Sequence, residues 1–329
     1  MKNSSKLLFY SMMIMSTMMI ISSENILSMW MGLEINMISF IPIMFEEKNT
    51  SSAESCMIYF LTQSLGSILL LISVLIYPLI SIYQFTLDEW VKTLMSSSML
   101  IKLGVPPFHF WFPSILDKMN WENCMILMTW QKIGPLSMLS MMYIPAIQMI
   151  IVLSVIVGAM SGLNQTSIRK IMAYSSINHM GWIIACMKME NQLWFKYFMI
   201  YSFMIITITM SFNFNSMFFI NQMSTNLSGF TEKASITISM MSIGGLPPFL
   251  GFLPKWMVIQ NMIPSHSFTI ITVMIMMSLI TLLFYLRLIV TSFTISASTM
   301  KWIKSSKNKM LEMMIMVNLS LPLISLMSY

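Results

Sequence analysis

Long apolar runs recur along almost the whole chain and decide what it can fold into. The sequence has 329 residues, of which 57% are hydrophobic and only 9% are charged. A helix needs ~20 consecutive apolar residues to cross a bilayer core of ~30 Å. A chain of this length can also form two soluble domains, but the repeated apolar runs exclude that alternative. We therefore predict an all-α polytopic membrane protein.

The spacing of the apolar runs predicts about eleven transmembrane helices. Counts between ten and twelve fit the pattern, because the third, fourth and eighth runs have blurred ends. The expected spans are centred near residues 14, 35, 65, 101, 131, 156, 179, 203, 245, 279 and 318.

The basic residues fall at the ends of the expected spans and in loops, and they predict the orientation. Lys2 and Lys6 precede the first span, Arg169 and Lys170 join the sixth and seventh, and four lysines between 301 and 309 precede the last. With eleven spans and the N-terminus inside, all three groups lie on the same side, as the positive-inside rule requires. The C-terminus is then outside. Although the net charge is +6, no basic stripe with interleaved aromatics is present, so no nucleic-acid partner is expected.

A weak internal repeat links the two halves of the chain. Residues 103–108 read LGVPPF and residues 245–249 read GLPPF, and the two Pro-Pro pairs are 141 residues, or five spans, apart. A unit with an odd number of spans inserts upside down relative to its twin. The repeat therefore predicts two inverted five-helix units, 1–142 and 143–291, followed by a basic loop and a C-terminal transmembrane helix in 292–329. Inverted repeats with broken helices are a transporter pattern, although two simple helix kinks would also produce these motifs.

Each Pro-Pro pair breaks a helix and thereby creates a polar spot at membrane depth. Proline lacks an amide proton and clashes with the preceding turn, so a pair frees several carbonyls. In lipid these carbonyls need side chains, water or neighbouring helices as partners. Lys102 precedes the first pair by one helical turn, and Lys255 follows the second.

Four ionisable residues lie inside or at the end of apolar spans: Glu34, Lys102, Lys132 and Lys255. A charge at the bilayer centre costs at least ~2.5–3.5 kcal/mol, and such residues usually pair, face a wet cavity or carry ions. Burial disfavours an ammonium at Lys102, whereas a nearby Glu34 carboxylate favours it, so a small displacement of the carboxylate would capture or release a proton. The alternatives are a purely structural Glu34–Lys102 pair and lysines that snorkel to an interface, for which Lys255 is best placed.

His179 is the fifth candidate for proton transfer. It follows Ser175 and Ser176 in the seventh span, and their hydroxyls could order a water chain beside the imidazole. Histidine exchanges protons near neutral pH. The alternative is a buried histidine that only satisfies a hydrogen bond.

No motif predicts a cofactor or metal in this chain. Cys56, Cys124 and Cys186 are isolated and lack the paired spacing of zinc or iron–sulfur ligands. We find no GxGxxG or phosphate-binding loop, and the first apolar run does not resemble a cleavable leader. The 43 methionines are typical of an AT-rich genome with an extra methionine codon, which indicates an organelle-encoded protein.

Five segments carry a family resemblance: Trp30–Pro42, Ile101–Pro113, Thr129–Leu136, Asn164–Trp182 and Ser242–Trp256. They resemble the antiporter-like membrane subunits that respiratory complex I shares with multi-subunit cation/proton antiporters, and the resemblance spans nearly the whole chain. Bacterial members begin with three further helices. In lacking them this chain is similar to the animal mitochondrial form.

The resemblance implies a role for each candidate residue. Glu34 and Lys102 match the family's Glu–Lys pair, Lys132 the central lysine, His179 a histidine on the polar axis, and Lys255 the lysine of the second broken helix. It further implies a hetero-oligomer with other complex I membrane-arm subunits, surrounded by phospholipids in the mitochondrial inner membrane, with the N-terminus in the matrix and the C-terminus in the intermembrane space. NADH, FMN, iron–sulfur clusters and ubiquinone are expected in partner subunits.

Two rival functions stay open from the sequence. A stand-alone cation/proton antiporter would need several membrane carboxylates, and Glu34 is the only acid deep in a span. A membrane scaffold would hold the assembly together while its neighbours pump. Replacing Lys132 with methionine separates a scaffold from a proton carrier, because a scaffold would still assemble and support normal pumping, whereas a proton carrier would assemble but lose turnover or coupling.

Overall fold

The computed structural model describes residues 3–46, 49–83, 88–142, 147–189, 192–223 and 229–294, and the single residues Ile315 and Asn318. All regular elements in these ranges are helices, and one isolated bridge joins Ser167 and Phe219. The chain divides into two compact units, Met1–Ile147 and Gln148–Tyr329.

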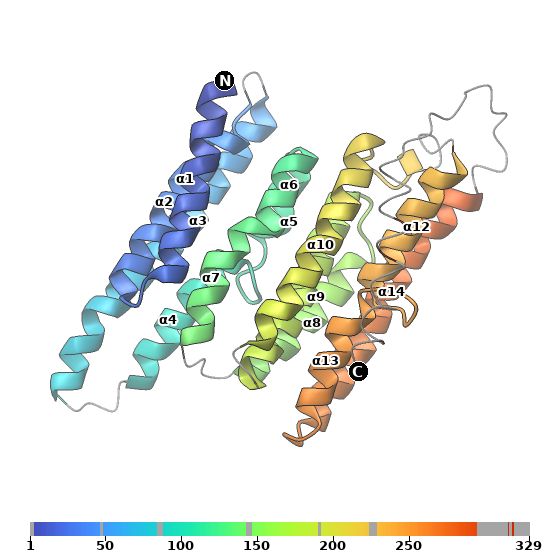
Figure 1. Cartoon of the computed structure of the whole chain (residues 1–329). Coiled ribbons are helices and arrows are strands. Elements are labelled where there is room, and N and C mark those ends of the chain that lie inside the picture. Colours follow the sequence, from blue (N-terminus) through green and yellow to red (C-terminus); the bar gives the residue numbers. More distant parts are fainter. Residues whose placement is uncertain are drawn as a thin grey trace. The chain divides into compact units, whose positions relative to one another are not determined.

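Unit 1 is a bundle in which α1, α2 and α3 run side by side and α3 also packs against α4 and α5 (Figure 1). Its helices are α1 (Asn3–Ser22), α2 (Ile26–Met44), α3 (Thr50–Tyr83), α4 (Asp88–Leu103), α5 (Trp111–Lys118), α6 (Trp121–Met128) and α7 (Trp130–Met141). Thr129 alone separates α6 from α7, so these two short helices form one interrupted rod.

Unit 2 is built around α9, which packs against α10, α13 and α14. Its helices are α8 (Ile147–Gly162), α9 (Ile168–Met189), α10 (Leu193–Phe214), α12 (Phe230–Gly244), α13 (Phe252–Met262) and α14 (Phe268–Thr294). The Arg287 guanidinium of α14 donates hydrogen bonds to the carbonyls of Leu163 at 2.5 Å and Gln165 at 2.7 Å, and so ties the loop after α8 to α14.

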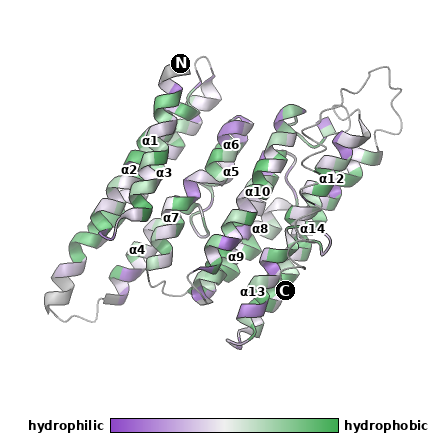
Figure 2. Cartoon of the chain, viewed as in Figure 1, coloured by the Kyte–Doolittle hydropathy of each residue, from purple (hydrophilic) through white to green (hydrophobic). Residues whose placement is uncertain are grey.

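The outer faces of the helices are apolar, as a lipid-facing surface requires. Hydrophobic residues dominate the helices, and hydrophilic residues occupy short segments (Figure 2). Leu7, Met15, Met57 and Met149 are each at least 66% exposed. A water-soluble bundle would bury such side chains. The predicted all-α membrane protein is therefore confirmed in class.

The predicted count of eleven spans is not confirmed. By length and composition, five described helical segments can cross a membrane: Ser5–Ser22, Ile26–Met44, Thr50–Pro78, Leu193–Phe214 and Phe268–Phe293. Other expected spans are divided into shorter helices, namely α4 and α5, α6 and α7, and α12 and α13. The helix α8 has only 16 residues, and α9 carries three basic side chains that lower its hydropathy.

The predicted inverted repeats stay a prediction. The boundary between the compact units follows Ile147, whereas the predicted boundary followed residue 142. The last predicted segment, 292–329, lies outside the described residues except for 292–294, Ile315 and Asn318.

The first Pro-Pro segment ends α4 and leads through a turn to α5. Gly104 has a φ of +67°, and its N–H donates to the Ile101 carbonyl at 3.2 Å. The Trp111 indole N–H donates to the same carbonyl at 3.1 Å, and the Gln63 amide donates to the Lys102 carbonyl at 3.1 Å. Side chains thus satisfy carbonyls that the broken helix leaves open, as an environment without water requires.

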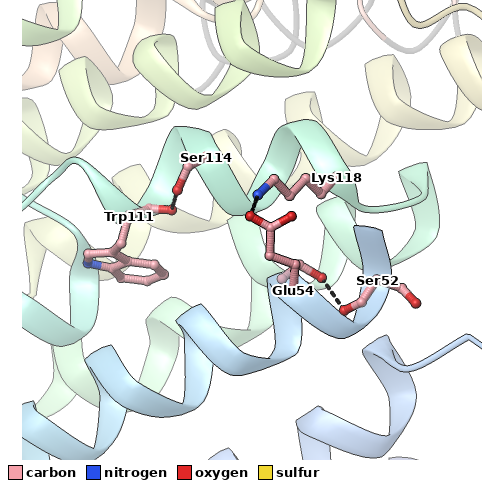
Figure 3. Close-up of polar contacts among 6 residues, drawn as sticks. Ser52, Glu54, Trp111, Ser114 and Lys118 are labelled. Carbon is pink, nitrogen blue, oxygen red and sulfur yellow. Dashed lines mark hydrogen bonds and ion pairs between the residues drawn. The ribbon is translucent and has the colours of Figure 1, made fainter. Parts of the chain in front are cut away.

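The short helix α5 makes one partly exposed ion pair with α3 and contains one local hydrogen bond. Lys118 at the end of α5 pairs with Glu54 of α3, and the Ser114 hydroxyl donates a hydrogen bond to the Trp111 carbonyl at 2.7 Å (Figure 3). The Lys118 and Glu54 side chains are 28% and 61% exposed, and exposed pairs of this kind contribute only ~0–1 kcal/mol. The pair therefore contributes little to the stability of the fold.

The second Pro-Pro segment ends α12 with a glycine in the left-handed region. Gly245 has a φ of +80°, and its N–H donates to the carbonyls of Met241 at 3.1 Å and Ser242 at 3.0 Å. A Cβ at Gly245 would lie 2.9 Å from the Lys255 side chain. Glycine is needed here for its backbone conformation and for the close approach of the lysine.

We expect Gly245→Ala to lower the free energy of unfolding by about 1–2 kcal/mol, because an L-residue in the left-handed region costs that much and its methyl group would displace Lys255. Gly244→Ala is the matched control, since the nearest atom to its added Cβ is 3.6 Å away. Thermal denaturation of the detergent-solubilised protein measures both. Equal melting temperatures for the two variants would contradict the packing described at this break.

Candidate functional site

Lys102 lies in the last turn of α4, at the first helix break. Lys102 is only 6% exposed to solvent. A Cβ at Gly66 of α3 would lie 2.9 Å from the Lys102 Cγ, so the glycine makes the groove in which the lysine stem runs. The C-terminal end of a helix carries partial negative charge and favours a cation, which partly offsets the cost of burying this ammonium.

Lys132 lies in the first turn of α7, after the one-residue interruption that follows α6. It is 3% exposed, and its Nζ lies 4.9 Å from the centre of the Phe112 ring. An ammonium over an aromatic face gains a cation–π interaction that is stronger when it is desolvated. The burial does not fit a side chain that snorkels to an interface.

Lys102 and Lys132 line the same small cavity in unit 1. Its other polar lining groups are the side chains of Tyr59, Gln63 and Gln131. The cavity has room of about 10 Å³ for the centre of a water molecule, which is on the order of what one water requires. The structure therefore brings together two of the predicted lysines, separated by a polar space.

The Gln131 carboxamide joins α7 to three other helices at this cavity. Its Oε1 accepts a hydrogen bond from the Tyr59 hydroxyl at 3.2 Å, and its Nε2 donates to Asn36 Oδ1 at 3.1 Å and to Met13 Sδ at 3.4 Å. Asn36, Gln131 and Lys102 also line a second cavity of about 10 Å³. Gln131 thus lines two spaces of water size.

Glu34 of α2 is half-buried, in contrast to the lysines. It interacts electrostatically with Lys102, but within the described ranges the two side chains form no ion pair at 4.0 Å or less. The carboxylate therefore influences the lysine through space without direct contact. Its partial exposure leaves it open to a neighbouring protein.

Lys255 projects from α13 to the second helix break. Its Nζ donates to the Gly244 carbonyl at 2.8 Å and lies 5.9 Å from the centre of the Trp182 ring. With 6% exposure the side chain does not snorkel. Lys255 thus places its charge at the C-terminal end of α12, much as Lys102 does at the end of α4.

His179 lies in the interior of unit 2, on α9. Its Nδ1 is 2.9 Å from the Tyr197 hydroxyl, and its ring centre is 5.2 Å from that of Tyr201. The serine hydroxyls that we expected beside it donate to backbone carbonyls, Ser175 to Met172 and Ser176 to Ala173. Tyr197 is therefore a direct polar partner of the imidazole.

Sequence reasoning missed the neutral polar residues of both units: Asn36, Tyr59, Gln63, Gln131 and Tyr197. Only Gln131 had a sequence signal, because it is adjacent to Lys132. Tyr59 and Gln131 are 72 residues apart, and a helical period does not identify a partner at that separation.

The sequence matches a known family over most of its length. Residues 23–281 match the family described as NADH:quinone oxidoreductase/Mrp antiporter, TM. NADH-ubiquinone oxidoreductase chain 2 of Anopheles gambiae is 43% identical over 325 residues, which cover 97% of this chain and 95% of that protein. The chain 2 proteins of Locusta migratoria and Ceratotherium simum are 40% and 38% identical, with 99% and 96% of this chain covered and 94% and 95% of theirs.

Solved structures share the fold at low sequence identity. A chain of respiratory complex I from Thermus thermophilus superposes with a TM-score of 0.86 at 17% identity, covering 99% of this chain and 79% of that one. A chain of the Mrp complex from Dietzia gives 0.78 at 14% identity, covering 96% and 74%.

We expect Gln131→Leu to lower the free energy of unfolding by about 1–3 kcal/mol, because it leaves the buried Tyr59 hydroxyl without its acceptor. Adding Tyr59→Phe removes the hydroxyl that has lost its acceptor. The double variant should therefore lose less free energy of unfolding than the two single variants lose together. Thermal or denaturant unfolding of the three variants completes the double-mutant cycle. Additive losses would show that the two side chains are not coupled.

Proposed function

Since this chain belongs to the NADH:quinone oxidoreductase/Mrp antiporter family of membrane proteins, we propose that it is the chain 2 subunit of respiratory complex I and carries protons across the membrane. The observation that supports this most directly is the cavity that Lys102 and Lys132 line together. Buried ionisable side chains with room for water between them are the elements of a proton path through a membrane.

The energy for proton movement comes from partner subunits. We place NADH oxidation, FMN, the iron–sulfur clusters and ubiquinone reduction there, and this chain contributes the membrane part of an H⁺-translocating NADH:ubiquinone reductase. Its half-buried Glu34 is the group that a neighbouring subunit can reach. A displacement of this carboxylate changes the cost of holding Lys102 as an ammonium, and the lysine takes up or releases a proton in response.

The proton released by Lys102 moves through water in the shared cavity to the amine of Lys132. Gln63 and Gln131 line the cavity that the proton crosses. As neutral side chains they can hydrogen-bond water without trapping the charge. In unit 2 the corresponding groups are His179 and Lys255. Each lysine therefore alternates between amine and ammonium, and no redox chemistry occurs in this chain.

We further propose eleven spans, in which the pairs α4–α5, α6–α7 and α12–α13 each cross the membrane as one interrupted helix. The single helices α1, α2, α3, α8, α9, α10 and α14 supply seven more spans, and the apolar run near residue 318 supplies the last. The basic residues then orient the N-terminus toward the mitochondrial matrix and the C-terminus toward the intermembrane space. The neighbours are other membrane-arm subunits and the phospholipids of the inner membrane.

Lys132→Met in the intact complex tests the proposed function. We expect the complex to assemble, since methionine fills a similar apolar volume, while the coupled NADH:ubiquinone turnover falls at least about tenfold because a proton carrier is lost. Native gels measure assembly, and proton uptake or release by reconstituted vesicles measures pumping.

Lys118→Met is the matched control, because Lys118 is a partly exposed lysine whose ion pair lies away from the cavity. Its turnover and pumping should match those of the unaltered complex. A Lys132→Met complex that assembles and pumps normally would instead identify this chain as a scaffold.

A further inference from the structure

Unit 2 contains a group of buried tyrosines around His179 that the proton path described above does not use. Tyr197, Tyr201 and Tyr285 are each at most 1% exposed. Tyr197 and Tyr201 come from α10 and Tyr285 from α14. A buried hydroxyl is costly unless it has a hydrogen-bond partner, and phenylalanine would fill nearly the same volume. Packing alone therefore does not explain why these three positions carry a hydroxyl.

The three hydroxyls have different partners. That of Tyr197 lies 2.9 Å from His179 Nδ1. That of Tyr201 is directed to Ser176, although the Tyr201 ring packs 5.2 Å from the imidazole. That of Tyr285 lies beside Ser175 but outside hydrogen-bond geometry. The Tyr197 hydroxyl thus lies within hydrogen-bond distance of the imidazole.

The Tyr197–His179 contact is suited to proton relay because each partner can both donate and accept. A phenol has one O–H and free lone pairs, and a neutral imidazole has one N–H and one bare nitrogen. When the Tyr197 hydroxyl donates to a bare Nδ1, the imidazole proton resides on Nε2. The opposite end of the ring is then ready to release a proton.

We propose that Tyr197 is the proton-relay partner of His179, a role that rests on the proposed function of the chain. A hydronium ion at the phenol oxygen supplies a proton, and a new O–H bond forms there as the original Tyr197 O–H bond breaks. The original proton forms an Nδ1–H bond, while the Nε2–H bond breaks and its proton passes to a second water. One proton moves through, and both side chains end neutral.

The relay requires a water molecule beside the Tyr197 phenol. The Tyr285 hydroxyl is buried without a hydrogen-bond partner in the described part of the chain. A buried hydroxyl of this kind is ordinarily satisfied by a water molecule. Buried titratable side chains on α9 and on the helices that pack against it include Cys186, Tyr197, Tyr201, Lys255 and Tyr285.

Tyr197→Phe in the assembled complex tests the relay. We expect normal assembly, about a fivefold fall in coupled turnover, as expected for loss of one hydrogen bond to the reacting group, and a changed shape of the pH–rate profile. Tyr201→Phe is the matched control, because it removes an equally buried hydroxyl from the same helix but leaves the imidazole contact intact. Its turnover and pH–rate profile should stay unchanged.

A double-mutant cycle with His179→Leu identifies whether Tyr197 acts through the histidine. In that background Tyr197→Phe should cause no further loss of turnover. Equal effects of Tyr197→Phe and Tyr201→Phe, an unaltered pH–rate profile, or additive losses in the double variant would each overturn the relay. If the His179→Leu complex pumps normally, the proposed role of His179 in proton transfer is wrong. If His179→Leu abolishes pumping but Tyr197→Phe has no effect, the proposed relay through Tyr197 alone is wrong.

Discussion

Backbone carbonyls that are freed inside a membrane need partners within the protein, and the two helix breaks depend on how this need is met. At the first break the indole of Trp111 and the amide of Gln63 donate to carbonyls at the end of α4. At the second break the ammonium of Lys255 itself donates to the Gly244 carbonyl. Lipid supplies no hydrogen bonds, so these polar side chains are required for the breaks to exist. Once present, they form a polar site at membrane depth.

Both breaks combine a buried lysine with a glycine that leaves room for its side chain. Gly66 accommodates the stem of Lys102, and Gly245 accommodates that of Lys255. In each unit the charge lies near the C-terminal end of a half-helix, where the partial negative charge of the backbone favours it. Buried charges can therefore be retained without a direct carboxylate contact, and Glu34 is free to act on Lys102 from a distance.

The sequence predicted the elements of the site that carry a strong local signal. Three lysines in apolar runs and two Pro-Pro pairs identified both breaks, and all three lysines are buried. The functional pairing of Glu34 with Lys102 stays a prediction, and the distance between α2 and α4 depends on packing that no sequence neighbour reveals. Gln63, Gln131 and Tyr197 were missed for a similar reason, since their partners lie on other helices. The count of spans was also uncertain, because a hydropathy pattern does not show where a helix is interrupted.

Hydration of the space between Lys102 and Lys132 is the property on which the whole account depends. The most direct measurement is an experimental structure of the intact complex in lipid, at a resolution that shows ordered water. We predict at least one water in the cavity bounded by Lys102, Gln131 and Lys132, within hydrogen-bond distance of a lysine Nζ. A dry contact, with apolar side chains filling the space between the two lysines, would contradict the proton path.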